Sequence, residues 1–109
     1  MFHINGETWQ IALVSPGHPG LCRSDGDCSI GCCDDNEKCI YICDTLSMVM
    51  IKRVLCHEIV HAMMFSYQVP LTYRQEEIVA GIIDTYGEKI INITDKILVG
   101  KLGFAEKNK

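Results

Sequence analysis

The segment LCHEIVHAMMF, residues 55–65, decides the fold of this 109-residue chain. It is apolar almost all the way round, which is typical of a buried helix, yet it contains His57, Glu58 and His61. Burying such groups without a partner costs several kcal/mol. On a helix, His57 and His61 project from the same face one turn apart, so both imidazoles can bind one Zn²⁺. Glu58 lies one step round the helix, where the His-Glu-x-x-His pattern places a catalytic base beside the metal.

A tetrahedral zinc site with an open position needs a third protein ligand. The two remaining histidines, His3 and His18, lie in a predicted strand and a Gly/Pro-rich loop, and no spacing recommends either of them. The downstream helix offers two adjacent acids, Glu76 and Glu77.

Glu77 is the better of these two acids. Gly81 and Asp84 continue its helical face, whereas Glu76 shares a face with apolar side chains and is expected to be a solvated carboxylate at a helix start. The sequence therefore predicts one Zn²⁺ per chain, held by three side chains: His57, His61 and Glu77.

Residues 1–45 contain two predicted β-hairpins. FHINGETWQIALV, residues 2–14, has β-rich arms around Asn5-Gly6, a strong hairpin-turn signal. CSIGCCDDNEKCIYICD, residues 28–44, alternates so that Ile40 and Ile42 share one face. We expect an antiparallel sheet whose outer edge, residues 38–44, is open to an extended substrate.

Helices are predicted for the rest of the chain. The His-Glu-x-x-His helix occupies residues 46–67, and a Thr72/Gln75 capping box starts a second helix at Tyr73. Gly87 is expected to interrupt this second helix and to separate it from a third helix that ends near residue 102, within a helical region 72–103. The prediction is one α+β domain over residues 1–109, with two hairpins packed against three helices.

The composition excludes several classes of protein. A formal charge of −4 without a basic stripe argues against nucleic acid or an anionic membrane surface as a partner. No apolar stretch is long enough to span a membrane and no signal peptide is evident, so we expect a cytoplasmic protein.

The chain has seven cysteines and no Cys-x-x-Cys pair. We expect all seven to be reduced, because the count is odd and the expected compartment is reducing. A two-residue turn in the second hairpin would place Cys32 opposite Cys39 and Cys28 opposite Cys43, where they could oxidise or bind a second metal.

Two motifs together resemble a known family. HEIVH followed by QEEIVAGIIDTYG is similar to the small ImmA/IrrE-like metallopeptidases of phages, prophages and mobile elements, which are minimal gluzincins. The SDG loop, the CDDN hairpin and MFSY extend the resemblance over nearly the whole chain. The resemblance implies a zincin-like fold in a bacterial host, with Glu77 as the third ligand, and a protein substrate, since relatives cleave repressors.

One position departs from the family pattern. The family places an acid or amide four residues after the ligand glutamate, where it can hydrogen-bond a zinc-bound imidazole, and this chain has Gly81 there. Asp84, one turn further on, is the candidate replacement, and Gly81→Asp is expected to raise metal affinity.

Two functions follow from these features. The first is a zinc metallopeptidase that acts on a protein substrate, with Glu58 as the base and one of Tyr67, Tyr73 and Tyr86 as a donor to the oxyanion. The second is a catalytically weak or inactive zinc-binding module that acts by binding a regulatory protein, as Gly81 and the small size suggest. The first is favoured because a purely structural site needs no Glu58; a thiol redox protein is a third and weaker hypothesis.

Overall fold

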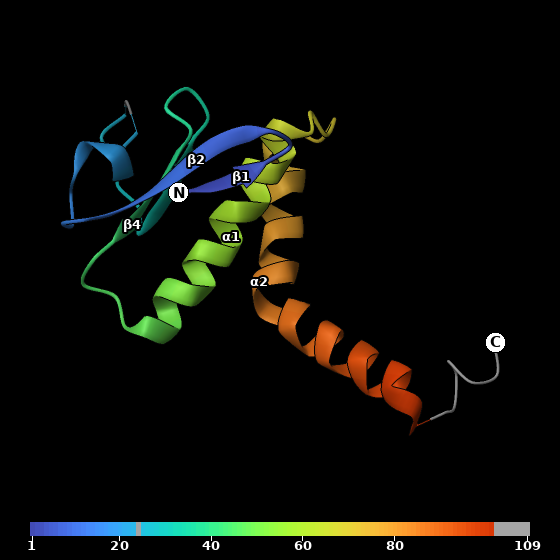
Figure 1. Cartoon of the computed structure of the whole chain (residues 1–109). Coiled ribbons are helices and arrows are strands. Elements are labelled where there is room, and N and C mark those ends of the chain that lie inside the picture. Colours follow the sequence, from blue (N-terminus) through green and yellow to red (C-terminus); the bar gives the residue numbers. More distant parts are fainter. Residues whose placement is uncertain (24, 102–109) are drawn as a thin grey trace.

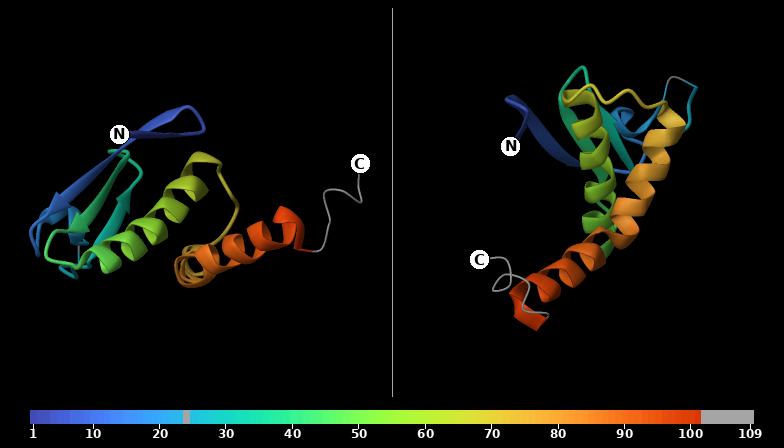
Figure 2. Two further views of the ribbon diagram at one scale, coloured as in Figure 1. Left: turned by 60° about the horizontal axis from the view of Figure 1, so that its bottom comes forward. Right: turned by 90° about the vertical axis from the view of Figure 1, so that its right-hand side faces the viewer.

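A mixed four-stranded sheet and two long helices make up the α+β fold of the computed structural model, which describes residues 1–23 and 25–101 (Figure 1). Helix α1 lies between the sheet and α2 (Figure 2). The elements in chain order are β1 (Phe2–Ile4), β2 (Glu7–Val14), the 3-10 turn η1 (Pro19–Leu21), β3 (Gly31–Asp34), β4 (Cys39–Cys43), α1 (Met48–Ser66), α2 (Tyr73–Lys96) and the π-helical turn η2 (Ile97–Lys101).

Both predicted hairpins form, but the prediction of a wholly antiparallel sheet was wrong. The strand order is β1-β2-β4-β3, and β2 pairs with β4 in parallel. The loop between β2 and β3 carries the chain across to the far edge, so β4 returns into the centre of the sheet. The predicted open edge, residues 38–44, is therefore paired on both sides, and β3 is the edge strand instead.

The register of the second hairpin also differs from the prediction. Cys32 lies opposite Tyr41, and Cys39 lies opposite Asp34. The turn is longer than two residues because Asp34 Oδ1 accepts hydrogen bonds from the backbone N–H groups of Asn36 and Glu37. The pairing of Cys32 with Cys39 is thus excluded by register.

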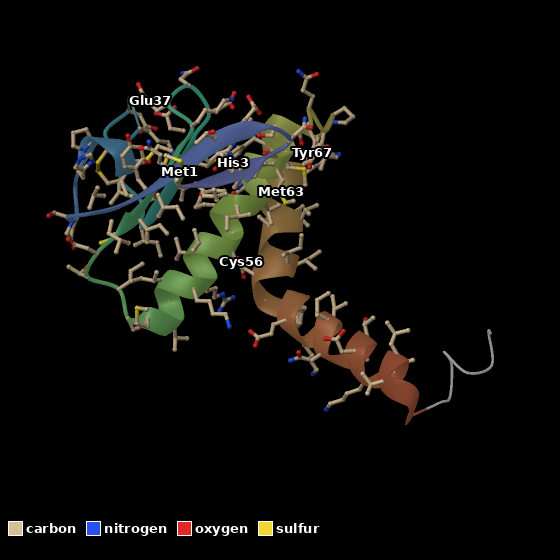
Figure 3. All side chains as sticks on the ribbon, viewed as in Figure 1. Met1, His3, Glu37, Cys56, Met63 and Tyr67 are labelled. Atoms are coloured by element: carbon tan, nitrogen blue, oxygen red, sulfur yellow. A yellow bond between two sulfur atoms is a disulfide. The ribbon has the colours of Figure 1, made fainter. Side chains whose placement is uncertain are left out.

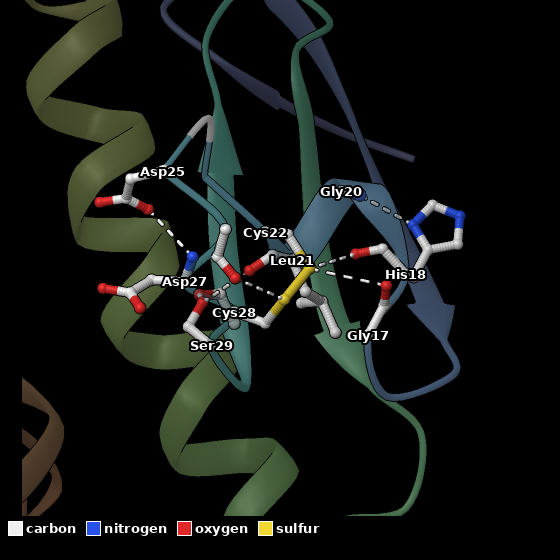
Figure 4. Close-up of a disulfide and its surroundings, with 11 residues drawn as sticks. Gly17, His18, Gly20, Leu21, Cys22, Asp25, Asp27, Cys28 and Ser29 are labelled. Carbon is white, nitrogen blue, oxygen red and sulfur yellow. Dashed lines mark hydrogen bonds between the residues drawn. A yellow bond between two sulfur atoms is a disulfide. The ribbon is translucent and has the colours of Figure 1, made fainter.

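A disulfide joins Cys22 to Cys28 next to η1 (Figure 4), so the expectation that all cysteines are reduced was wrong for this pair. The two residues form an isolated antiparallel bridge, and the backbone N–H of Ser29 donates to the carbonyl of Leu21 at 2.8 Å. Because such bridges persist mainly in oxidising surroundings, this one gives no support to the cytoplasmic expectation. The free cysteines of the described chain are Cys32, Cys33, Cys39, Cys43 and Cys56.

Helix α1 starts and ends where the sequence predicts. Ser47 caps its first turn by accepting a hydrogen bond from the N–H of Met50 at 3.2 Å. Its last residue, Ser66, accepts a hydrogen bond from Nε1 of the fully buried Trp9 at 3.2 Å, which fixes the end of the helix to β2. The core between α1 and the sheet is formed by Ile4, Trp9, Ile40, Ile42, Val54 and Ala62.

Helix α2 begins with the predicted capping box of Thr72 and Gln75, but it does not break at Gly87. A single glycine costs only about 1 kcal/mol inside a helix, which is too little to end one that is otherwise favourable. The predicted third helix is therefore the second half of α2, which extends away from the sheet and α1 (Figure 1). Its predicted end at residue 102 lies outside the described residues. Within the described chain, we find no helix with the length and apolar character needed to cross a membrane.

Candidate metal centre

Helices α1 and α2 bring the three predicted ligands together. His57 and His61 project from α1, and Glu77 comes from the second turn of α2. Glu77 Oε1 lies 3.1 Å from Nε2 of His57 and 2.5 Å from Nε2 of His61. The ligand atoms all lie within 4.8 Å of one another, so this group can hold a metal ion.

The second nitrogen of each imidazole contacts a carboxylate. Nδ1 of His57 donates to Asp84 Oδ2 at 2.7 Å, and Nδ1 of His61 donates to Glu76 Oε1 at 2.9 Å. These bonds direct both Nε2 atoms toward Glu77, which is the arrangement that metal-binding histidines usually have. The donor set therefore fits a metal ion in both its composition and its orientation.

Asp84 occupies the position predicted for it, whereas the prediction for Glu76 was wrong. Glu76 is buried rather than solvated, because the first turn of α2 packs against the last turns of α1 at His61. One signal in the sequence could have identified it: Ala80 and Gly87 lie on its helical face, and small residues there permit a close approach of two helices.

The lack of an acid or amide side chain at Gly81 is already compensated by other residues. A Cβ atom at this position would meet nothing within 4 Å, so the glycine leaves open space beside the site. Since Asp84 and Glu76 already bind the two Nδ1 atoms, an acid at position 81 has no free imidazole nitrogen to orient. The structure therefore gives no basis for the expected gain from Gly81→Asp.

Arg53, which the sequence analysis did not single out, holds Asp84 in place. Its Nε donates to Asp84 Oδ1 at 3.1 Å, and its Nη2 donates to Thr85 Oγ1 at 2.9 Å. Burial raises the pKa of Asp84, but hydrogen bonds from His57, Thr85 and Arg53 outweigh it and lower that pKa overall. Asp84 thus stays ionised as a partner for His57.

The ligands are electrostatically coupled in the metal-free chain. Burial lowers the pKa of His57, but its hydrogen bonds to Asp84 and Glu77 outweigh burial, so that pKa is raised. Burial likewise raises the pKa of Glu77, and the hydrogen bonds from His57 and His61 reverse this and lower it. Both shifts arise because carboxylates outnumber cations around the two imidazoles.

Glu58 is buried beside this cluster and is not among the three ligands. Burial is the main cause of its raised pKa; the nearby imidazoles oppose the shift. Its side chain lies against β3, because a Cβ at Gly31 would be 3.3 Å from Glu58 Oε2 and would collide with Val54. The glycine thus lets the edge strand approach α1 at the position of Glu58.

A cavity of about 670 Å³ opens in front of the site. Edge-strand residues Gly31 and Cys32 line one wall, and Tyr73 lines another, with its ring stacked on His61 at a centroid distance of 5.8 Å. Tyr73 is therefore the tyrosine that borders the cavity. The other two candidates, Tyr67 and Tyr86, do not line it; Tyr67 lies just after the C-terminal end of α1 (Figure 3).

The two remaining histidines lie elsewhere, as predicted. Nδ1 of His3 contacts Thr8 Oγ1 at 3.2 Å on the first hairpin. Nδ1 of His18 accepts a hydrogen bond from the backbone N–H of Gly20 at 2.9 Å, as drawn in Figure 4, and its ring stacks on Tyr41. Both imidazoles thus have local structural partners.

The fold and site define an α+β domain with a two-histidine, one-carboxylate centre that can hold a metal ion. Comparisons of the chain with protein-family models, curated proteins and solved structures gave no match.

Proposed function

We propose that this protein is a zinc metallopeptidase of the ImmA/IrrE-like kind, which hydrolyses a protein substrate. The observation that carries the proposal is the convergence of His57, His61 and Glu77, with a buried acid, Glu58, beside the ligands and outside their set. Two imidazoles and one carboxylate form the ligand set of zinc peptidases, which leaves the fourth position open.

The charges of the site support a dication. Four carboxylates, those of Glu58, Glu76, Glu77 and Asp84, surround the two imidazoles, and the guanidinium of Arg53 contacts one of them, Asp84. Such an excess of negative charge in a partly buried place is costly without a counter-ion. A bound Zn²⁺ would offset it and would polarise the scissile carbonyl as a Lewis acid.

Glu58 has the properties of a general base. Its pKa is raised by burial, toward the range in which a carboxylate both accepts and releases a proton efficiently. It would take a proton from the attacking water on a carboxylate oxygen and pass it to the nitrogen of the leaving amine. A residue with only a packing role would have no reason to be ionisable at this position.

The cavity suits an extended peptide. Edge strand β3 forms one wall, so its unpaired backbone groups could bind a substrate as an added strand. Tyr73 is the remaining candidate for donating a hydrogen bond to the developing oxyanion. Repressor proteins are the substrate class that the family resemblance suggests.

The alternative is a zinc-binding module that holds a regulatory protein without cleaving it. One observation that favoured this alternative no longer does so. Gly81 favoured it because an orienting partner for a histidine was missing, and Asp84 and Glu76 supply such partners. The buried Glu58 opposes it.

The test compares wild type with Glu58→Gln and, as a matched control, with Glu88→Gln, which makes the same change on the exposed surface of α2. Each is co-expressed with repressors from the same genetic element, and zinc content is measured in parallel. We expect fragments of one repressor with wild type and Glu88→Gln, and an intact repressor with Glu58→Gln at unchanged zinc content. Equal depletion by wild type and Glu58→Gln would show that cleavage is not the mechanism and would support the binding module.

A further inference from the structure

The second half of α2 carries a wide apolar face that no described part of the chain covers. On a helical wheel with 100° per residue, one side of the helix covers ten consecutive positions, or about half of the circumference. These positions contain only apolar residues, one glycine and one threonine. The large apolar side chains on this face are Ile82, Ile83, Tyr86, Ile90, Ile91, Ile93, Ile97 and Leu98.

These eight side chains are between 38% and 59% exposed. Figure 3 shows side chains that project into open space along the extended part of α2. The radius of gyration, 17.0 Å, exceeds the roughly 13 Å expected of a compact chain of this length, because the helix projects from the domain. Of the 24 residues of α2, only Glu76 and Ala80 are buried.

We propose that this face pairs with the same face of a second copy of the chain, so that the protein is a dimer joined through α2. The inference does not rest on the proposed peptidase function. Eight half-exposed apolar side chains present on the order of 600 Å² per chain, close to the roughly 800 Å² per partner that a stable interface buries. The area of this apolar patch is at the upper limit of the areas that monomeric proteins leave exposed to solvent.

The spacing of the apolar residues fits a two-helix seam. Helices that pair along an apolar seam interdigitate the side chains at the a and d positions of a heptad. Within α2 the a positions of this seam are Ile83 and Ile90, and the d positions are Tyr86 and Ile93; Ile97 follows in the π-helical turn η2. The a and d positions of this seam are centred about 100° round the helix from Ala80, which packs on α1, so a second copy can meet the seam without displacing α1; Ile91, at the margin of the apolar face, lies on the same side of the helix as Ala80.

The test measures self-association of the full-length chain by sedimentation equilibrium up to about 100 μM. Ile90→Glu adds a charge on the apolar face, and Asn92→Glu adds the same charge on the opposite side of the same helix. We expect wild type and Asn92→Glu to dimerise, and Ile90→Glu to weaken the dimer by at least about 100-fold, since it buries an unpaired charge. Circular dichroism checks that each variant is folded; Ile93→Glu serves if Ile90→Glu is not.

A wild-type chain that stays monomeric at about 100 μM, or a folded Ile90→Glu variant that dimerises as tightly as wild type, would overturn the proposal and leave the face to another protein or a membrane.

Discussion

Replacing Glu76 tests whether the buried carboxylate behind His61 serves the metal. Glu76 Oε1 accepts a hydrogen bond from His61 Nδ1 at 2.9 Å, and both side chains are buried. In Glu76→Ala the Nδ1–H group loses its partner and the ring is free to turn. Removing such a partner typically weakens metal affinity by about 10- to 100-fold, which corresponds to about 1.4–2.7 kcal/mol.

Glu76→Gln separates orientation from charge. The amide oxygen can still accept the hydrogen bond from Nδ1, so the ring stays in place, but the negative charge that makes His61 a better ligand is lost. We expect an intermediate loss of zinc affinity, about 3- to 10-fold. Without metal, Glu76→Ala should also lower the free energy of unfolding by about 1–3 kcal/mol, because it leaves a buried donor unpaired.

The assay is competition for zinc against a chromophoric chelator, with Glu88→Gln as the control for loss of a carboxylate from α2. Glu77→Ala marks the effect of removing a ligand outright. If Glu76→Ala binds zinc within about twofold of wild type, a smaller loss than orienting partners give, Glu76 is only a packing residue and our account of the site is wrong at this position.

Four further outcomes are expected. His57→Ala should abolish stoichiometric zinc in purified protein, as measured by elemental analysis, and a variant that retains it would refute the site. Zinc affinity should fall as the pH drops through the raised pKa of His57, because the protonated imidazole cannot bind metal; chelator competition between about pH 5.5 and 8 measures this. In metal-free protein the free energy of unfolding should depend on pH in two ways. The stability that comes from the lowered pKa values of Glu77 and Asp84 is lost as pH falls, whereas the stability that comes from the raised pKa of His57 is lost as pH rises through its folded value. Urea unfolding should therefore show a maximum of stability between these limits. Thiol titration of unfolded, unreduced protein should find five free groups, and seven would show that the disulfide does not form.

The features that the sequence predicted well depend on local signals. Ser47 and Thr72 mark the starts of the two helices because their side chains cap backbone groups only three residues away. The separation of His57 and His61 follows from helical geometry alone. Glu77 could be preferred to Glu76 because the residues that share one face of a helix follow from the sequence of that helix alone.

The features that the sequence missed depend on how distant elements meet. The parallel pairing of β2 with β4 is set by the path of a loop that has no strong pattern of its own. The contact of Glu76 with His61 depends on the angle at which α2 crosses α1, and that angle follows from packing at Ala80. The break expected at Gly87 failed because the helix formers around it outweigh the cost of one glycine.

The small contribution of α2 to the core would give a bound metal a structural role as well. Its two buried residues, Glu76 and Ala80, cannot hold a helix of 24 residues in place by apolar contact. The exposed ion pair between Lys52 and Glu88 adds little. In the metal-free chain the first half of α2 is therefore attached to α1 largely through the hydrogen bonds of His57, His61 and Arg53.

A metal ion ligated from both helices would replace these pH-sensitive contacts by bonds that link α1 directly to α2. Binding to the folded state alone stabilises it by about 2.7 kcal/mol when free zinc exceeds its dissociation constant about 100-fold. Zinc should therefore raise the Tm of wild type, and it should leave that of His57→Ala unchanged. The same ion would then fix the geometry around Glu58 and hold α2 in the position from which its apolar face projects.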